Sequence, residues 1–243
     1  MSRGPNVRAL ILNGQCGSGK STQACRLRAH AERLGLGVAT VAVDDAVERI
    51  TNGNTTDHPW DEFISSIAPQ VLEELCDECR GGFLSDDLTG RIVSYLVGQI
   101  SETPSPDLLI FDGFPHTSAQ VKTATKILAD AGVRIGIGGN AFFVRLQIKP
   151  ETCASRLVRR ADSGAGPDFM AIKRRMRAYD EHQYSLRTVV PDAGLCFLQV
   201  GAIDHAEEDV VTKRIISTLP DMFFCTSVAR HLNTGVATTA VTS

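Results

Sequence analysis

The feature that most constrains the fold is a glycine-rich octapeptide, Gly14-Gln15-Cys16-Gly17-Ser18-Gly19-Lys20-Ser21. It matches the pattern G-x-x-x-x-G-K-[S/T], in which backbone N–H groups curl around phosphate oxygens at the start of a helix. The apolar run Val7–Leu12 predicts a buried strand before the octapeptide, and Ser21–Leu34 predicts a helix after it. Because motif and context occur together, a chance glycine turn is the weaker interpretation. We expect a phosphate-binding loop.

Short apolar runs alternate with helical segments along the rest of the chain. The other predicted strands are Val38–Val43, Asp107–Phe111, Ala141–Ile148 and Cys196–Val200. The other predicted helices are Pro69–Arg80, Asp86–Ile100, Ser118–Asp130, one opened by Pro150, Ile172–Leu186 and Glu207–Leu219. Apolar strands alternating with helices predict a parallel sheet covered on both faces. The expected fold class is therefore α/β, a three-layer αβα sandwich of the P-loop NTPase type with a five-stranded parallel sheet.

Composition narrows the class of partner. The chain has 243 residues and a formal net charge of -3, which gives no reason to expect nucleic acid as the main partner. No apolar run approaches the length of a membrane span, and no signal-peptide pattern is present. Seven scattered cysteines favour a reducing compartment, so we expect a cytoplasmic protein. We also expect the protein to be a monomer. The pair Cys76 and Cys79 lacks partners for a zinc site and shares an apolar helical face, which favours core packing.

A phosphate loop does not specify a reaction, but three further segments do. The segment Gly82–Leu88, the element Asp112-Gly113-Phe114-Pro115 and the run Arg156-Leu157-x-x-Arg160 follow the loop in that order. With Ile172–Arg175 and Tyr179 they resemble the adenylate kinase family of nucleoside monophosphate kinases. The resemblance spans about residues 7–219, and the D-G-F-P element is more specific than the loop.

The resemblance implies a domain organisation. An adenylate kinase-like domain over 1–219 would contain a small helical insert that binds the monophosphate, at about 45–100, and a short lid at about 160–169. The long, zinc-binding lid is absent. A C-terminal tail would occupy 220–243 without fixed structure, although Phe223 and Phe224 could dock on the body.

The donor half of the predicted site would bind ATP as its Mg²⁺ complex. Lys20 would neutralise phosphate charge, while the Ser21 hydroxyl and the strand-end Asp112 would hold the metal or its waters. The resemblance implies that Arg156 stacks on the ATP adenine and that Arg160 and Arg175 act with Lys20 in catalysis. The predicted cofactor-binding residues are Gly14, Gln15, Cys16, Gly17, Ser18, Gly19, Lys20, Ser21, Thr22 and Arg156.

The acceptor half follows from the same resemblance. Gln120 would read the adenine edge of AMP, and Arg49 would grip the acceptor phosphate. The predicted substrate-binding residues are Arg49, Phe83, Leu84, Gly113, His116 and Gln120. Arg159, Arg174 and Arg177 are expected on the surface, as is common in a run of charges on a helix.

Two departures weaken the acceptor half. The family's D-G-F-P-R reads Asp112–His116 here, and a histidine is only partly charged near neutrality and lacks the two-pronged fork of an arginine. The lid segment Ala161–Asp168 carries no arginine. ATP binding is therefore predicted more firmly than fast turnover.

The expected reaction is ATP plus AMP to two ADP, at a reduced rate if these losses are not compensated. Two alternatives stay open: a kinase for UMP, CMP or another monophosphate, and a catalytically weakened ATP-binding or sensing protein. A P-loop GTPase is disfavoured, because D-G-F-P replaces the D-x-x-G switch and no guanine-reading segment is found.

Overall fold

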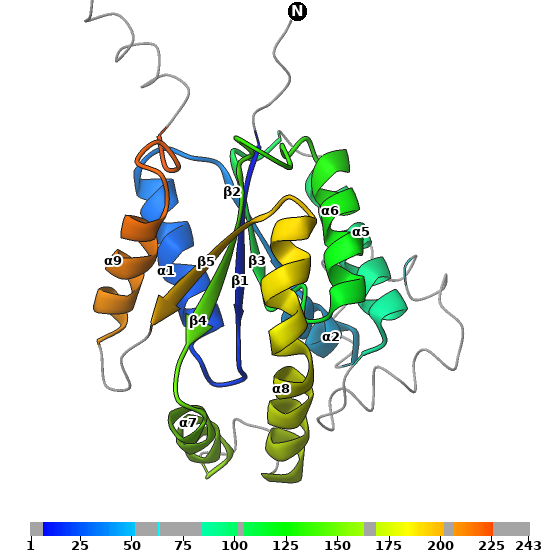
Figure 1. The fold of residues 1–243 in the computed structure, drawn as a ribbon, viewed down its shortest axis with the longest axis vertical. Coiled ribbons are helices and arrows are strands. Elements are labelled where there is room, and N and C mark those ends of the chain that lie inside the picture. The colour runs from blue at the N-terminus through cyan, green and yellow to red at the C-terminus, as the bar shows by residue number, and fades with distance from the viewer. Residues whose placement is uncertain are drawn as a thin grey trace, which may run out of the picture.

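The computed structural model describes residues 7–51, 63, 84–101, 105–162, 169–201 and 207–225. These residues form one five-stranded parallel sheet in the order β2-β3-β1-β4-β5, with helices on both faces (Figure 1). The strands are β1 (Arg8–Gly14), β2 (Val38–Ala42), β3 (Leu108–Asp112), β4 (Ala141–Gln147) and β5 (Cys196–Gly201). The predicted α/β fold class and its five-stranded parallel sheet are thereby confirmed.

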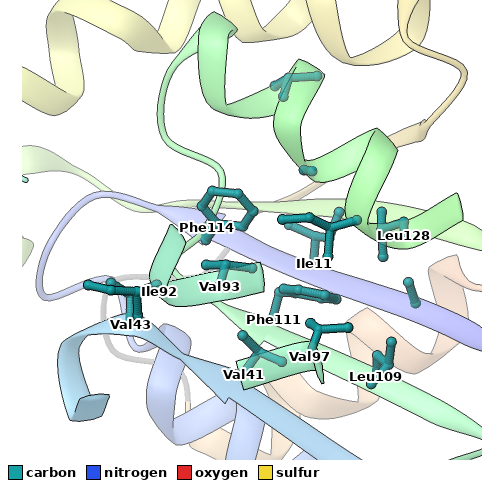
Figure 2. Packing of buried hydrophobic residues seen from close by; sticks show 14 of the residues in the cluster. Ile11, Val41, Val43, Ile92, Val93, Val97, Leu109, Phe111, Phe114 and Leu128 are labelled. Carbon is teal, nitrogen blue, oxygen red and sulfur yellow. The ribbon is translucent and has the colours of Figure 1, made fainter. Parts of the chain in front are cut away.

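Two hydrophobic cores lie on opposite faces of the sheet. Helices α1 (Lys20–Arg33) and α9 (Glu208–Thr218) cover one face, and α5 (Asp86–Ser101), α6 (Ser118–Asp130) and the upper part of α8 (Phe169–Asp192) cover the other (Figure 1). Successive residues of a strand point to opposite faces, so β1 serves both cores and is buried along its whole length. Figure 2 shows one of the two cores, where strand residues Ile11 and Phe111 pack with Phe114 and helix residues.

The structure extends the predicted elements in two places. Helix α2 (Val43–Thr51) was not predicted, because the apolar run of β2 continues into its first residue. Helix α8 runs six residues past the predicted end at Leu186. It continues because Leu186 and Val190, one turn apart, are 1% and 0% exposed, and Gly194 closes it with a φ of 79°. The predicted helix Pro69–Arg80 and the Cys76–Cys79 pair lie outside the described residues.

The described residues after α9, up to Cys225, dock on the body of the domain. Phe223 and Phe224 are 3% and 8% exposed, and Phe223 packs edge-on against Phe142. The buried Arg8 guanidinium donates to the carbonyl oxygens of Phe223 at 2.5 Å and Cys225 at 2.8 Å. The docking that the sequence allowed is therefore present through residue 225.

The topology brings the sequence motifs together at one edge of the sheet. Leu12 of β1 pairs with Asp112 of β3, so the glycine loop and the D-G-F-P turn leave the sheet side by side. Helix α7 (Pro150–Asp162) follows β4 at the same edge (Figure 1). Ligands of such sheets bind beyond the carboxyl ends of the strands. Among the described helices, none combines the length and the apolar character that crossing a membrane would require.

Candidate active site

The glycine loop has the backbone shape that a phosphate cradle needs. Gly17 and Gly19 have φ values of 82° and 91°, in the left-handed region that favours glycine. A Cβ on Gly17 would lie 2.7 Å from the carbonyl oxygen of Cys153, so the loop rests directly on α7. Gly19 caps α1, whose N-terminal N–H groups therefore open toward the loop.

Two predicted donor-side cations donate hydrogen bonds to this loop. Lys20 Nζ donates to the carbonyl oxygens of Gly14 at 2.9 Å and Gln15 at 3.3 Å, and Arg156 Nη1 donates to that of Gly17 at 3.4 Å. Thr22 lies in the first turn of α1, and the buried Ser18 hydroxyl has no hydrogen-bond partner among the described residues. A phosphate could replace the carbonyl contacts of the two cations, because it offers stronger acceptors to the same donors.

The predicted metal ligands, Ser21 and Asp112, approach each other from α1 and β3. Burial raises the pKa of the Asp112 carboxyl, while the neighbouring Ser21 hydroxyl and the Lys20 ammonium oppose the rise. Asp44 and Asp45 at the start of α2 add to the rise. A divalent cation would stabilise the ionised form of this buried carboxyl, and a hydroxyl with a carboxylate is the oxygen donor set that Mg²⁺ prefers. The residues present therefore fit a magnesium ion.

A cleft adjoins the loop and collects both predicted and unpredicted residues. It is lined by Gly14, Cys16, Lys20, Val43, Asp44, Leu84, Thr89, Gly113, His116, Gln120, Arg175 and Tyr179. Leu84, Gly113, His116 and Gln120, all predicted for the acceptor, are thus brought together with the catalytic candidates Lys20 and Arg175. Asp44 and Thr89 were missed, although two adjacent acidic residues directly after a buried strand are a signal for a site at the sheet edge.

His116 is less charged than the sequence suggested. Burial, together with the nearby Lys20, His182 and Arg175, lowers its pKa to about 4, while Asp44 acts in the opposite direction. The imidazole is therefore neutral at pH 7, where the expectation was partial charge. At this position the acceptor phosphate would lose a whole positive charge relative to an arginine.

Gln120 is held in one orientation. Its Oε1 accepts from the backbone N–H of His116 at 2.7 Å, and only 3% of the residue is exposed. A backbone N–H can only donate, so the amide oxygen must face it and the Nε2 donors must point elsewhere. Thr117 caps α6 by accepting from the Gln120 N–H at 3.1 Å, and it donates to Asp86 of α5 at 2.8 Å.

The remaining predicted residues fall into three groups: outside the cleft lining, exposed on the surface, or outside the described part of the chain. Arg49 lies on the exposed side of α2 and is not among the described residues that line the cleft. Arg159, Arg174 and Arg177 are exposed, as predicted. Phe83, the side chain of Arg160 and the lid residues 163–168 lie outside the described part of the chain.

Comparisons with known proteins agree with the geometry. No family model matches the chain. The chain is 26% identical to the adenylate kinase of Micrococcus luteus over 213 residues, 86% of this chain and 89% of that protein. It is 29% identical to the adenylate kinase of Kocuria rhizophila over 222 residues, 88% and 98% of the two chains. With the adenylate kinase of Thermus thermophilus it shares 29% over 177 residues, 72% and 78% of the two chains. The phosphate loop, the D-G-F-P turn, the sheet order and these relatives together identify the chain as a divergent homologue of the adenylate kinase family.

Proposed function

We propose that this protein transfers the γ-phosphate of ATP to a nucleoside monophosphate, with AMP as the acceptor, in the cytoplasm and as a monomer. The observation that carries the proposal is the shared cleft, in which the loop residue Lys20 and the helix residue Arg175 adjoin Gly113 and Gln120 of the expected acceptor side. A site that only bound ATP would not require an acceptor pocket joined to the phosphate loop. The insert at 45–100 and the lid at 160–169 belong to the same proposal.

Phosphoryl transfer requires little covalent chemistry from the protein. The acceptor phosphate is already ionised, so its oxygen can attack the γ-phosphorus in line without a general base. The loop N–H groups and Lys20 hold the donor phosphates, and Arg175 stabilises the charge that spreads over the transferring group. Ser21 and Asp112 would hold Mg²⁺, which would neutralise phosphate charge. Arg160 is proposed to assist from the end of α7, and Arg156 to stack on the donor base.

A second acceptor is favoured by one specific observation. Because the Gln120 oxygen is committed to the His116 N–H, the amide presents mainly donors to the cleft. The adenine edge offers one acceptor and one amino donor, whereas a pyrimidine edge can offer two acceptors. UMP and CMP are therefore the second candidates.

Paired variants of Gln120 test how the base is read. Gln120→Glu keeps an oxygen for the His116 N–H but loses both donors, whereas Gln120→Ala loses both functions. If Nε2 reads AMP, Gln120→Glu lowers kcat/KM for AMP by about 10-fold, the value of one hydrogen bond. The measurement is initial rates with ATP and AMP, CMP or UMP. An equal fall with all three monophosphates would show that Gln120 shapes the turn and does not select the base.

A further inference from the structure

Arg145 is a buried cation on an interior strand of the sheet, near the carboxyl end of that strand. It lies on β4 directly opposite Asn13 of β1, and 6% of it is exposed. Within the described part of the chain it forms no ion pair with a carboxylate. Burying a guanidinium without such a partner costs free energy, so packing alone does not explain an arginine in this apolar strand.

Among the described residues, the hydrogen-bond and ring partners of the Arg145 guanidinium lie on α8. It donates to the backbone oxygen of Gln183 at 3.4 Å and also to Gln183 Oε1. Its Cζ lies 5.9 Å from the centre of the Tyr179 ring, within the range of a cation–π interaction. One side chain of the sheet thus holds two successive turns of the helix.

The same turns of α8 also contact the glycine loop and the strand before it. Asp180 Oδ1 accepts from Gln183 Nε2 at 3.1 Å and from Gln15 Nε2 of the loop at 3.5 Å. Tyr179 Oη donates to Asn13 Oδ1 at 3.4 Å. The helix is therefore tied to the loop through Asp180 and to β1 through Tyr179 and Asn13.

Arg175 lies one helical turn before Tyr179 and lines the cleft with Lys20. We infer that Arg145 is a positioning residue, which fixes α8 against β4 and the glycine loop so that Arg175 faces the transferring phosphate. The inference rests on the proposed function, in which Arg175 stabilises that phosphate. A displacement of about 1 Å in such a group can lower the rate about 100-fold. Fixing the position of α8 therefore favours phosphate transfer.

Arg145→Met separates positioning from packing. Methionine keeps an unbranched apolar stem but removes every donor and the charge. Replacing a buried charge by an apolar group is often neutral or stabilising, so the midpoint of thermal unfolding is expected to stay the same or rise. Activity is expected to fall at the same time, which a purely structural role would not produce.

The kinetic experiment uses the full chain with ATP and its best monophosphate acceptor. Arg145→Met is expected to lower kcat by about 10- to 100-fold while the KM for ATP changes by less than about 3-fold. Arg145→Lys, which keeps the cation over Tyr179, is expected to recover part of kcat. In an Arg175→Ala background Arg145→Met should lower kcat no further, because both changes remove the same contribution. Arg187→Met removes an exposed guanidinium from the same helix and should change nothing.

Hydrogen exchange gives a readout that does not require turnover. Backbone amides of residues 175–183 and 14–20 are expected to exchange at least about 10-fold faster in Arg145→Met than in wild type, and at the wild-type rate in Arg187→Met. Unchanged exchange, or a fall in kcat that only parallels a fall in stability, would overturn the inference. If wild type transfers no phosphate to any monophosphate, the proposed function fails, and exchange alone decides the role of Arg145.

Discussion

At the scale of single residues, the acceptor half differs most from what the sequence predicted. The histidine of Asp112–His116 is visible in the sequence, but its neutrality depends on burial beside Lys20 and Arg175, which lie far away along the chain. Gln120 could be found by its distance from the D-G-F-P turn. The hydrogen bond that its side-chain oxygen accepts from the His116 N–H could not be predicted, because that bond depends on how the turn joins α6.

The lowered pKa of His116 predicts a pH dependence of stability. The folded pKa of about 4 lies below the ordinary 6.5, so the native state binds this proton less readily than the unfolded chain. The contribution is complete above about pH 6.5 and is lost as the pH falls toward 4. Urea unfolding at pH 7 and pH 4.5 should therefore show a larger loss of stability in wild type than in His116→Asn. The lowered pKa of His30 and the raised pKa of Asp112 act in both proteins and cancel in the comparison. Equal losses would contradict the assignment.

A glycine pair tests the shape of the phosphate loop. Gly17→Ala places a Cβ 2.7 Å from the Cys153 oxygen at a φ of 82°, which costs about 1–3 kcal/mol of strain. ATP affinity is expected to fall by about 10- to 100-fold in a fluorescent-nucleotide titration. The matched change Gly98→Ala lies in α5 with open space around it, and should raise stability by about 0.5–1 kcal/mol while leaving ATP affinity unchanged. Similar affinity in both variants would show that the loop tolerates a side chain at position 17.

At the scale of elements, apolar periodicity predicted the five described strands to within about two residues at each end, and the helix Ser118–Asp130 with its observed bounds. The misses have physical causes. Helix α2 begins inside an apolar run, and α8 continues because tertiary burial of Val190 outweighs the tendency of Pro191 to end a helix. The polar residues Asn13 and Arg145 interrupt two apolar strands, a signal that could have indicated a buried network.

The segment after α9 is predicted to contribute to the stability of the domain. Phe223→Ala removes a ring that is 3% exposed and packs on Phe142, which should lower the free energy of unfolding by about 3 kcal/mol. Met222→Ala, at a neighbouring residue that is 43% exposed, should change it by less than about 0.5 kcal/mol. Denaturant unfolding of both variants measures the difference. Equal effects would mean that the docking of Phe223 adds little.

At the scale of the whole molecule, the fold follows from alternation and from the loop motif. Continuous apolar strands require helices on both faces of the sheet. In a parallel sheet the carboxyl ends of all strands, beyond which ligands bind, lie at the same edge. That edge explains why residues from position 14 to position 179 meet in one cleft. The sequence could not reveal the balance of charge there, because neutral His116 and acidic Asp44 act on each other only in the folded chain.

The central claim is that the cleft passes a phosphate from ATP to a monophosphate. The most direct test is ADP formation from ATP plus AMP by purified protein, compared with Lys20→Ala. The account predicts measurable ADP from wild type that requires AMP, and a fall of at least about 100-fold in Lys20→Ala, because the lysine neutralises the transferring phosphate. The contradicting result is equal inactivity of both proteins with AMP, CMP and UMP.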